Sequence, residues 1–147
     1  IKATLEKLGN VNFWKVAMKP GRPLAFGKVK NAYFFGLPGN PVSVMVTFYI
    51  FVQAAIEKMM GHEPKPRIQI QAISTSELRK RPGRVEYQRG KFHLNDNNEY
   101  VVTKTGEQGS GILRSMSDAN CFIFLPMENS GISKGDKVEI WPFDSFV

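Results

Sequence analysis

The apolar segment from Pro41 to about Met60 is the feature that most restricts how this chain can fold. Before the charged residues at 57–58, its only polar side chains are Ser43, Thr47 and Gln53. A helix that is apolar on nearly every side is typical of burial between other layers. About 16 residues precede the charges, which is short for a helix that crosses a membrane. We therefore expect a core helix with structure on both sides of it.

The composition is that of a protein with a hydrophobic core. Of 147 residues, 42% are hydrophobic and 12% aromatic, which excludes disorder of the whole chain and suits one medium domain or two small ones. The single cysteine, Cys121, lies in an apolar run and is expected to be a buried thiol. Because His62 and His93 are far apart, no metal-ligand set is expected in this chain. We see no secretory leader pattern and expect a cytoplasmic protein without a membrane partner.

Residues 1–8 have the pattern of the end of an amphipathic helix. Ile1, Leu5 and Leu8 recur at spacings of four and three, and Gly9 is expected to close the helix in a left-handed conformation. No capping residue precedes the segment and no methionine begins it. We therefore expect the sequence to be a piece of a longer protein.

Positive charge is concentrated near the beginning of the sequence. The net charge is +7. Residues 1–62 hold eight Lys or Arg and two acids, which gives +6, whereas residues 63–147 hold 12 and 11, which gives +1. Seven of the eight early cations lie within residues 1–30. Such a concentrated field favours an anionic ligand.

Residues 11–19 alternate with a period of two and predict a strand. Lys15 and Lys19 fall on one face of this strand, and Trp14 and Met18 fall on the other. Two ammonium groups on one face are favoured when an anion lies beside them. The alternative is an edge strand whose lysines point into solvent and discourage pairing with other chains.

Two further strands, predicted at 24–29 and 33–37 with a turn at 30–31, lead into the segment GLPGNPVS at residues 36–43. Asn40 suits the N-cap of the following helix and Pro41 its first position. The glycines allow the backbone to approach a ligand closely, and the free N–H groups of a helix start attract anions. These features predict a phosphate-type cradle. The alternative is a loop in which glycine and proline only turn the chain.

After a linker at 61–66, the pattern changes to short alternating strands. They are predicted at 67–72, 85–94, 99–104, 121–125 and 137–141, with a hairpin or bulge where Arg89-Gly90 interrupts the second. This spacing favours a compact β barrel, and we place the domain boundary between residues 63 and 64.

A glycine-rich loop at 106–111 precedes a short predicted helix at 112–117. The loop offers a hydroxyl and backbone N–H groups to an anion, although a plain flexible connection explains the composition equally well. The basic residues at 79–81 and Arg84 are compatible with binding of a nucleic-acid single strand. Because this basic loop contains no aromatic residue, a solvated surface loop is favoured and no nucleic-acid partner is expected.

Several ordered motifs together resemble one protein family. They are FWKVAMKPGRP at residues 13–23, GLPGNPVS at 36–43, PGRVEYQRG at 82–90, GEQGSG at 106–111 and VEIWPF at 138–143. These motifs resemble the molybdopterin molybdenumtransferases, a family that includes bacterial MoeA and the E domain of gephyrin. The resemblance covers essentially the whole chain.

The resemblance implies a fold and a reaction. The fold is an α/β partial molybdopterin-binding (MogA-like) domain over residues 1–63, followed by a small all-β barrel domain over residues 64–147. The family inserts molybdate into adenylylated molybdopterin with magnesium, which releases AMP and the molybdenum cofactor, and it works as a cytoplasmic homodimer. The molybdopterin adenylyltransferase is a further implied partner.

The resemblance also implies site residues. Lys15 and Lys19 match functionally important lysines and are expected to be catalytic. The expected cofactor-binding residues lie in the first basic stretch, in the loop before the long helix and in the barrel. They are Arg22, Pro38, Gly39, Asn40, Pro41, Ser43, Arg89 and Ser110.

One motif of the family is missing. An acidic segment of the type Gly-Gly-Val-Ser-Val-Gly-Asp would lie just before Ile1, and its acidic residues would handle magnesium and molybdate. We therefore expect this polypeptide to retain part of the pterin phosphate site without catalysing insertion alone. An alternative role, implied by the gephyrin branch, is a module that binds a partner peptide.

Overall fold

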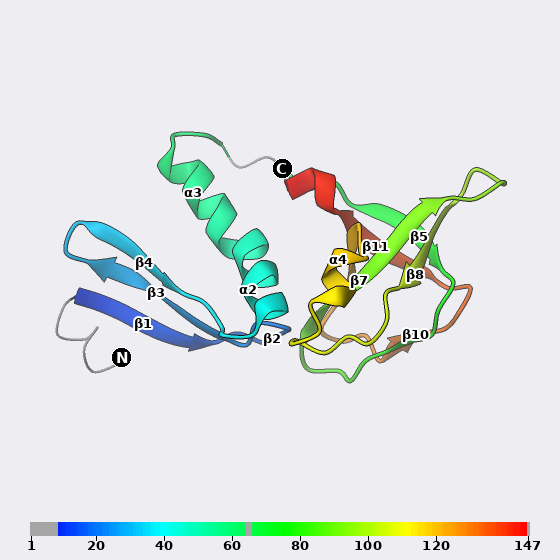
Figure 1. The fold of residues 1–147 in the computed structure, drawn as a ribbon, viewed down its shortest axis with the longest axis horizontal. Helices are drawn as coiled ribbons and strands as arrows, with labels where there is room; N and C mark the ends of the chain where they lie inside the picture. Colours follow the sequence, from blue (N-terminus) through cyan, green and yellow to red (C-terminus); the bar gives the residue numbers. More distant parts are fainter. Residues whose placement is uncertain (1–8, 64–65, 147) are drawn as a thin grey trace.

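The computed structural model describes residues 9–63 and 66–146, which form two packed parts (Figure 1). The first part contains an antiparallel sheet in the order β1-β3-β4. Its strands are β1 (Gly9–Lys15), β3 (Pro23–Val29) and β4 (Ala32–Gly36). A tight turn at residues 30–31 joins β3 to β4. The strands predicted at 24–29 and 33–37 and the turn between them are therefore confirmed.

The strand predicted over residues 11–19 is divided in two. The backbone bends at residues 16–17, where β1 has ended. A separate strand, β2 (Met18–Lys19), then pairs in parallel with β7 (Val85–Leu94) of the second part. Lys15 stays in the first sheet, while Lys19 joins the barrel. The predicted strand face shared by these two lysines is therefore wrong.

Gly9 begins β1 opposite Val29 instead of closing a helix. An added Cβ would overlap the carbonyl oxygen of Lys28, so the glycine serves a close approach between strands. The expectation of a left-handed Gly9 is wrong. The predicted helix end at residues 1–8 lies outside the described residues.

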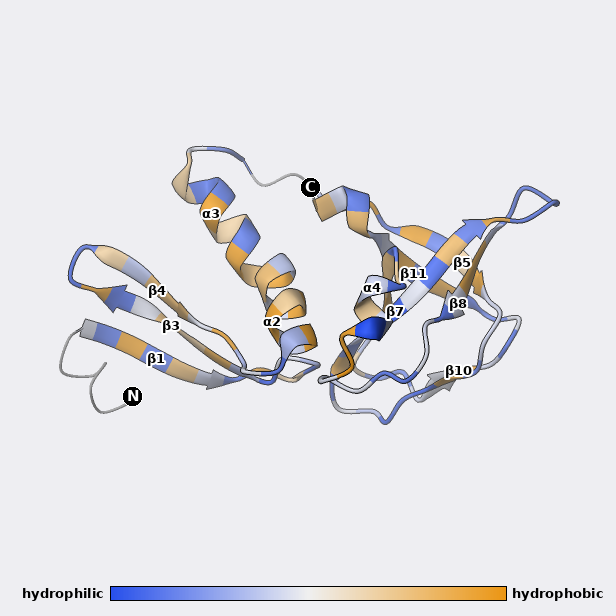
Figure 2. Cartoon of the chain, in the orientation of Figure 1, coloured by the Kyte–Doolittle hydropathy of each residue, from blue (hydrophilic) through white to orange (hydrophobic). Residues whose placement is uncertain are grey.

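The long helix predicted from Pro41 is one continuous run of three segments. They are α2 (Pro41–Thr47), the π-helical η1 (Phe48–Val52) and α3 (Gln53–Met59). Val42 and Val46 are fully buried in a cluster with barrel side chains, whereas no residue of α3 is buried. The prediction that this helix is buried between layers is therefore wrong for α3, although apolar residues continue along it (Figure 2).

The same helix, Pro41–Met59, is long and apolar enough to cross a membrane by length and composition alone, so the expectation that it is too short is wrong. Core helices of soluble proteins share this property.

The second part is a closed barrel. Its strands follow the order β7-β8-β5-β11-β9, and β9 pairs back onto β7. Besides β7, they are β5 (Ile70–Ser74), β8 (Tyr100–Lys104), β9 (Cys121–Leu125) and β11 (Lys137–Pro142). The predicted β barrel is confirmed, although its first strand begins at residue 70 instead of 67.

Short elements complete the barrel. They are the paired strands β6 (Leu78–Arg79) and β10 (Gly131–Ile132), the helix α4 (Arg114–Ser117) and the 3-10 helix η2 (Phe143–Phe146). The helix predicted at 112–117 is confirmed for its last four residues.

β7 is one uninterrupted strand, so the predicted break at Arg89-Gly90 is wrong. Gly90 pairs with Lys104 on one side and with Cys121 on the other. A Cβ at Gly90 would lie 2.8 Å from atoms of Ile123 and Val102. The glycine therefore allows close packing of the barrel core instead of a turn.

Cys121 is fully buried, as predicted. Its Sγ donates to the Gly90 carbonyl at 3.4 Å. Burial raises the pKa of the thiol to about 12, against the smaller opposing effect of that hydrogen bond. The thiol therefore stays protonated at neutral pH and acts as a core side chain.

Aromatic and polar contacts fix the long helix on the barrel. The Tyr49 ring centre lies 5.3 Å from that of Phe146 and 6.4 Å from that of Phe122. Arg67 donates to the Tyr49 carbonyl, and its guanidinium lies 4.1 Å from the centre of the Phe146 ring. Gln53 donates to the Phe146 carbonyl. These contacts hold the two parts together on the side of the molecule where the described chain ends.

Replacing Gly90 with alanine is expected to destabilise the barrel by about 1–3 kcal/mol, because the new methyl group overpacks a filled core. Urea denaturation measures this change in the free energy of unfolding. Gly111→Ala is the matched control, since an added Cβ there meets no atom within 4 Å. Equal stability of the two variants would contradict the packing described for β7.

Candidate functional site

A pocket of about 430 Å³ lies where the first part of the molecule meets the barrel. It is lined by residues 18–23, residues 38–40, Ser43, Arg84 and residues 108–110. The first three of these groups belong to the first part and the long helix, and the last two belong to the barrel. Segments far apart in the sequence therefore build one site.

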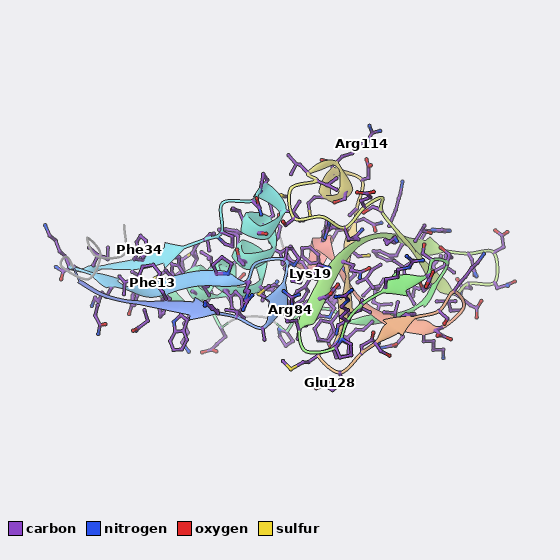
Figure 3. The ribbon with its side chains drawn as sticks, turned by 90° about the horizontal axis from the view of Figure 1, so that it is seen from below. Phe13, Lys19, Phe34, Arg84, Arg114 and Glu128 are labelled. Atoms are coloured by element: carbon purple, nitrogen blue, oxygen red, sulfur yellow. The ribbon has the colours of Figure 1, made fainter. Side chains whose placement is uncertain are left out.

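The charged residues of this pocket are all cations. Lys19, Arg22 and Arg84 line it, and its described lining includes no Asp or Glu. Figure 3 shows Lys19 and Arg84 near each other at the junction of the two parts. A pocket with cationic walls and no carboxylate attracts an anion.

The backbone around Gly21 lies directly on the long helix. Gly21 has a φ of 101°, and a Cβ there would lie 2.5 Å from the Thr47 methyl carbon. The Thr47 hydroxyl donates to the Ser43 carbonyl at 2.7 Å, which fixes that side chain. Glycine is needed for both the conformation and the close approach, which hold Lys19 and Arg22 at the pocket.

Asn40 occupies the N-cap position of α2 and Pro41 is its first residue, as predicted. The Asn40 side chain makes no capping hydrogen bond. Its Nδ2 instead donates to Ser110 Oγ at 3.0 Å. The loop before the helix and the glycine-rich loop of the barrel therefore meet at the pocket.

Arg89 lies behind the pocket and is not among its lining residues. It is 1% exposed, and it donates from Nε to Ser115 Oγ and from Nη2 to the Gly109 carbonyl, each at 3.1 Å. Burial lowers the pKa of its guanidinium to about 10, and the charge of Glu86 opposes this shift. Arg89 is therefore charged at neutral pH and holds the glycine-rich loop through the Gly109 carbonyl.

Gln108 fixes the same loop on β7 and was not predicted from the sequence. Its Oε1 accepts a hydrogen bond from the Arg89 N–H at 2.6 Å, and its Nε2 donates to the Arg89 carbonyl at 3.1 Å. Nε2 also donates to the Thr105 carbonyl. The amide thus pairs with β7 much as a neighbouring strand would, which places Ser110 at the pocket. The one sequence signal for Gln108 is its position inside the glycine-rich loop.

The structure brings together most of the predicted site residues. Those that line the pocket are Lys19, Arg22, Pro38, Gly39, Asn40, Ser43 and Ser110. Lys15 ends β1, Pro41 begins α2 and Arg89 is buried on β7, and none of these three lines the pocket. The functional roles of all these residues stay predictions.

Of the basic residues at 79–81 and Arg84, two have roles different from the one expected of a solvated loop. Lys80 is only 8% exposed, and its Nζ donates to the Met127 carbonyl at 3.1 Å and to the Asn129 carbonyl at 2.9 Å. The interpretation of a solvated loop is therefore wrong for Lys80. Arg84 is exposed but lines the pocket, and sequence reasoning missed it because only the fold brings it beside Lys19.

The described residues do not fit a magnesium ion. Within residues 9–63 and 66–146, no three His, Cys, Asp or Glu side chains come together as a metal site requires. The described pocket lining has no carboxylate, and magnesium is bound through carboxylate and other oxygen ligands.

Both parts of the chain match known families. The family described as a probable molybdopterin binding domain matches residues 1–58, and the MoeA C-terminal region (domain IV) matches residues 71–143. The molybdopterin molybdenumtransferase of Haemophilus influenzae is 48% identical over 144 residues, which cover 97% of this chain and 36% of that protein. Gephyrin of Dictyostelium discoideum is 34% identical, over 95% of this chain and 23% of its own length. The chain spans about a third or less of the length of these relatives.

Solved structures show the same arrangement of the two parts. The molybdopterin biosynthesis moeA protein of Pyrococcus horikoshii OT3 superposes with a TM-score of 0.71 at 29% identity, over 94% of this chain and 33% of that one. The molybdenum cofactor biosynthesis protein of Pyrococcus furiosus gives a TM-score of 0.74 at 25% identity, over 92% and 46%.

Replacing Gln108 with glutamate is expected to loosen the glycine-rich loop. A carboxylate cannot donate to the Arg89 and Thr105 carbonyls, and the loss of these two hydrogen bonds costs about 1–3 kcal/mol, while the Arg89 carbonyl keeps its hydrogen bonds from the Thr105 N–H and hydroxyl. Amide hydrogen exchange of residues 105–111 is expected to accelerate, while exchange in β11 stays unchanged. Gln69→Glu, at an exposed position, is the matched control. Unchanged exchange in the loop of the Gln108 variant would mean that other contacts hold it.

Proposed function

Because this chain belongs to the molybdopterin molybdenumtransferase family, we propose that it acts in molybdenum cofactor biosynthesis through the cationic pocket between its two parts. The ligand is adenylylated molybdopterin, and molybdate is the second substrate. One observation carries this proposal: among the residues that the structure describes, three cations and no acid line a pocket to which both family-matched regions contribute.

The proposed role of the three cations is to bind and orient phosphate. Lys19, Arg22 and Arg84 form charge-assisted hydrogen bonds to the phosphate groups that join the pterin to the adenosine. When AMP leaves, negative charge develops on its phosphate, and the same cations at the pocket stabilise it. These residues act by positioning the ligand and neutralising its charge.

Neutral groups at the pocket add donors to this cationic set. Asn40, Ser43 and Ser110 place an amide and two hydroxyls at the lining. Lys15, proposed as a second catalytic lysine, adds positive field from the end of β1 without lining the pocket.

The complete reaction belongs to a longer protein in this proposal. The chain spans 36% of the length of its Haemophilus influenzae relative, and the described lining of the pocket offers no carboxylate for magnesium. Magnesium ligands, the homodimer, the cytoplasmic location and the contact with the molybdopterin adenylyltransferase are therefore proposed for the whole protein. The polypeptide described here binds the phosphate end of the ligand and does not complete the insertion.

Loss of both lysines is expected to weaken anion binding. The variant with Lys15→Ala and Lys19→Ala should bind inorganic pyrophosphate about tenfold more weakly by calorimetry, as expected for the loss of a charge-assisted hydrogen bond. Lys19→Ala alone should account for most of the loss, because only Lys19 lines the pocket. Lys91→Ala removes a cation outside this pocket and is the control. Unchanged affinity of the double variant, with circular dichroism showing an intact fold, counts against the site.

An activity assay tests the division between this chain and the rest of the protein. Supplied with adenylylated molybdopterin, molybdate and magnesium, the polypeptide is expected to release little AMP compared with the full-length Haemophilus influenzae relative. Comparable turnover would show that the residues present suffice for the reaction and would overturn this part of the proposal.

A further inference from the structure

We propose that Glu86 is a positioning residue that holds the Lys19 side chain at the wall of the cationic pocket. This inference rests on the proposed function, which assigns an anionic ligand to that pocket. Glu86 is not among the lining residues, so it acts through Lys19 and not by touching the ligand.

Strand pairing brings the two side chains together. β2 runs parallel to β7, and Lys19 pairs with Glu86 in register. Lys19 Nζ lies 3.5 Å from Glu86 Oε1. Because β2 comes from the first part of the molecule and β7 from the barrel, this ion pair crosses the junction that the pocket occupies.

Glu86 is held more firmly than its partner. The Glu86 side chain is 7% exposed, whereas 47% of the Lys19 side chain is exposed. Glu86 Oε2 accepts a hydrogen bond from Gln88 Nε2 at 3.2 Å, and this Nε2 also donates to the Arg79 carbonyl at 3.0 Å. Both carboxylate oxygens therefore have partners, as a buried charge requires. Glu86 is the fixed member of the pair and Lys19 the adjustable one.

A fixed carboxylate is useful to a lysine in such a site. The four-carbon stem of lysine is flexible, and ordering it on ligand binding costs conformational entropy. An ion pair that is already formed limits the ammonium to positions near the pocket. Because the ammonium has three donors, it can keep its contact with Glu86 and still donate to an anion.

If only the net charge near the pocket mattered, losing Glu86 would change the affinity for an anion in the opposite direction. Its removal makes the surroundings of the pocket more positive, which strengthens anion binding if only the local charge matters. Removal of a positioning residue weakens binding instead. The sign of the change in affinity therefore separates the two explanations.

The experiment is a calorimetric titration of inorganic pyrophosphate into the wild-type chain and two variants with the same change of charge. Glu86→Gln is expected to weaken binding about fivefold, as one charge-assisted hydrogen bond becomes less well placed. Glu77→Gln is the matched control, because the Glu77 side chain is 68% exposed and pairs with Arg79 away from the pocket. It should leave the affinity unchanged. Binding by Glu86→Gln that equals or exceeds that of Glu77→Gln overturns the proposal.

A double-mutant cycle tests whether Glu86 acts through Lys19. In a Lys19→Met background, Glu86→Gln should cause no further loss of affinity. The same loss in both backgrounds would show a merely structural role and overturn the proposal. If Glu86→Gln does not fold, Glu86→Asp keeps the charge and withdraws it by one methylene. Its affinity is compared with that of the wild-type chain; a smaller loss is expected, and an unchanged affinity overturns the proposal.

A second readout does not depend on the ligand. In the NMR spectrum, the two Hε protons of Lys19 should have distinct shifts while the ammonium is held, and these shifts should merge in Glu86→Gln but not in Glu77→Gln. Unchanged shifts in Glu86→Gln overturn the proposal. If the wild-type chain binds no pyrophosphate, the proposed function fails at this pocket, and the Hε shifts alone then decide the role of Glu86.

Discussion

The parallel pairing of β2 with β7 is the contact on which the arrangement of the molecule depends. Only two residues of each strand take part, supported by the Val85 N–H, which donates to the Ala17 carbonyl at 3.0 Å. This short pairing draws the chain out of the first sheet and lays it along the barrel. Residues 18–23 consequently lie between the long helix and Arg84, and the pocket gains walls from both parts. Without the pairing, the basic stretch near the start of the sequence would belong to the first sheet alone.

Buried charges in the barrel serve to anchor loops. Lys80 is bonded to the carbonyls of Met127 and Asn129, and Arg89 is bonded to the carbonyl of Gly109. Each charge is satisfied by hydrogen bonds inside the protein, which a buried ionic group needs in place of water. Loops without regular strand partners are thereby fixed at one end of the barrel. The pocket thus has a preformed wall, which lowers the entropy lost when a ligand binds.

Local patterns predicted much of the fold, because alternation and turn residues act over short distances. β7 and β9 begin and end at the predicted residues, and the β3–β4 hairpin has its predicted turn. The division of the strand at 11–19 was missed because its cause, pairing with β7, lies about 70 residues away. Gly9 and Gly90 were misassigned because a glycine that admits a neighbouring strand has the same sequence signal as one that turns the chain.

The residues of the candidate site were also only partly predictable from the sequence. Charge concentration and loop composition pointed to Lys19, Arg22 and the two glycine-containing loops, whose chemistry is visible in the residues themselves. Arg84 and Gln108 were missed, because each acquires its role only where the folded chain places it. In the sequence, Arg84 cannot be told from other exposed arginines, nor Gln108 from other glutamines in loops.

The long helix serves two surfaces, and the π-helical η1 lies in the middle of it. Each residue of an α-helix turns the chain by about 100°, so a turn that contains an extra residue rotates everything after it. Val42 and Val46 of α2 and Gln53 of α3 contact the barrel part, whereas Ala55 and Met59 of α3 border a groove with Phe26, Tyr33 and Phe35 of the first sheet. The apolar segment that looked uniform in sequence therefore contacts the barrel on one face and borders the first sheet on another. A single helix can in this way contribute to two separate hydrophobic surfaces, one on the barrel and one on the first sheet.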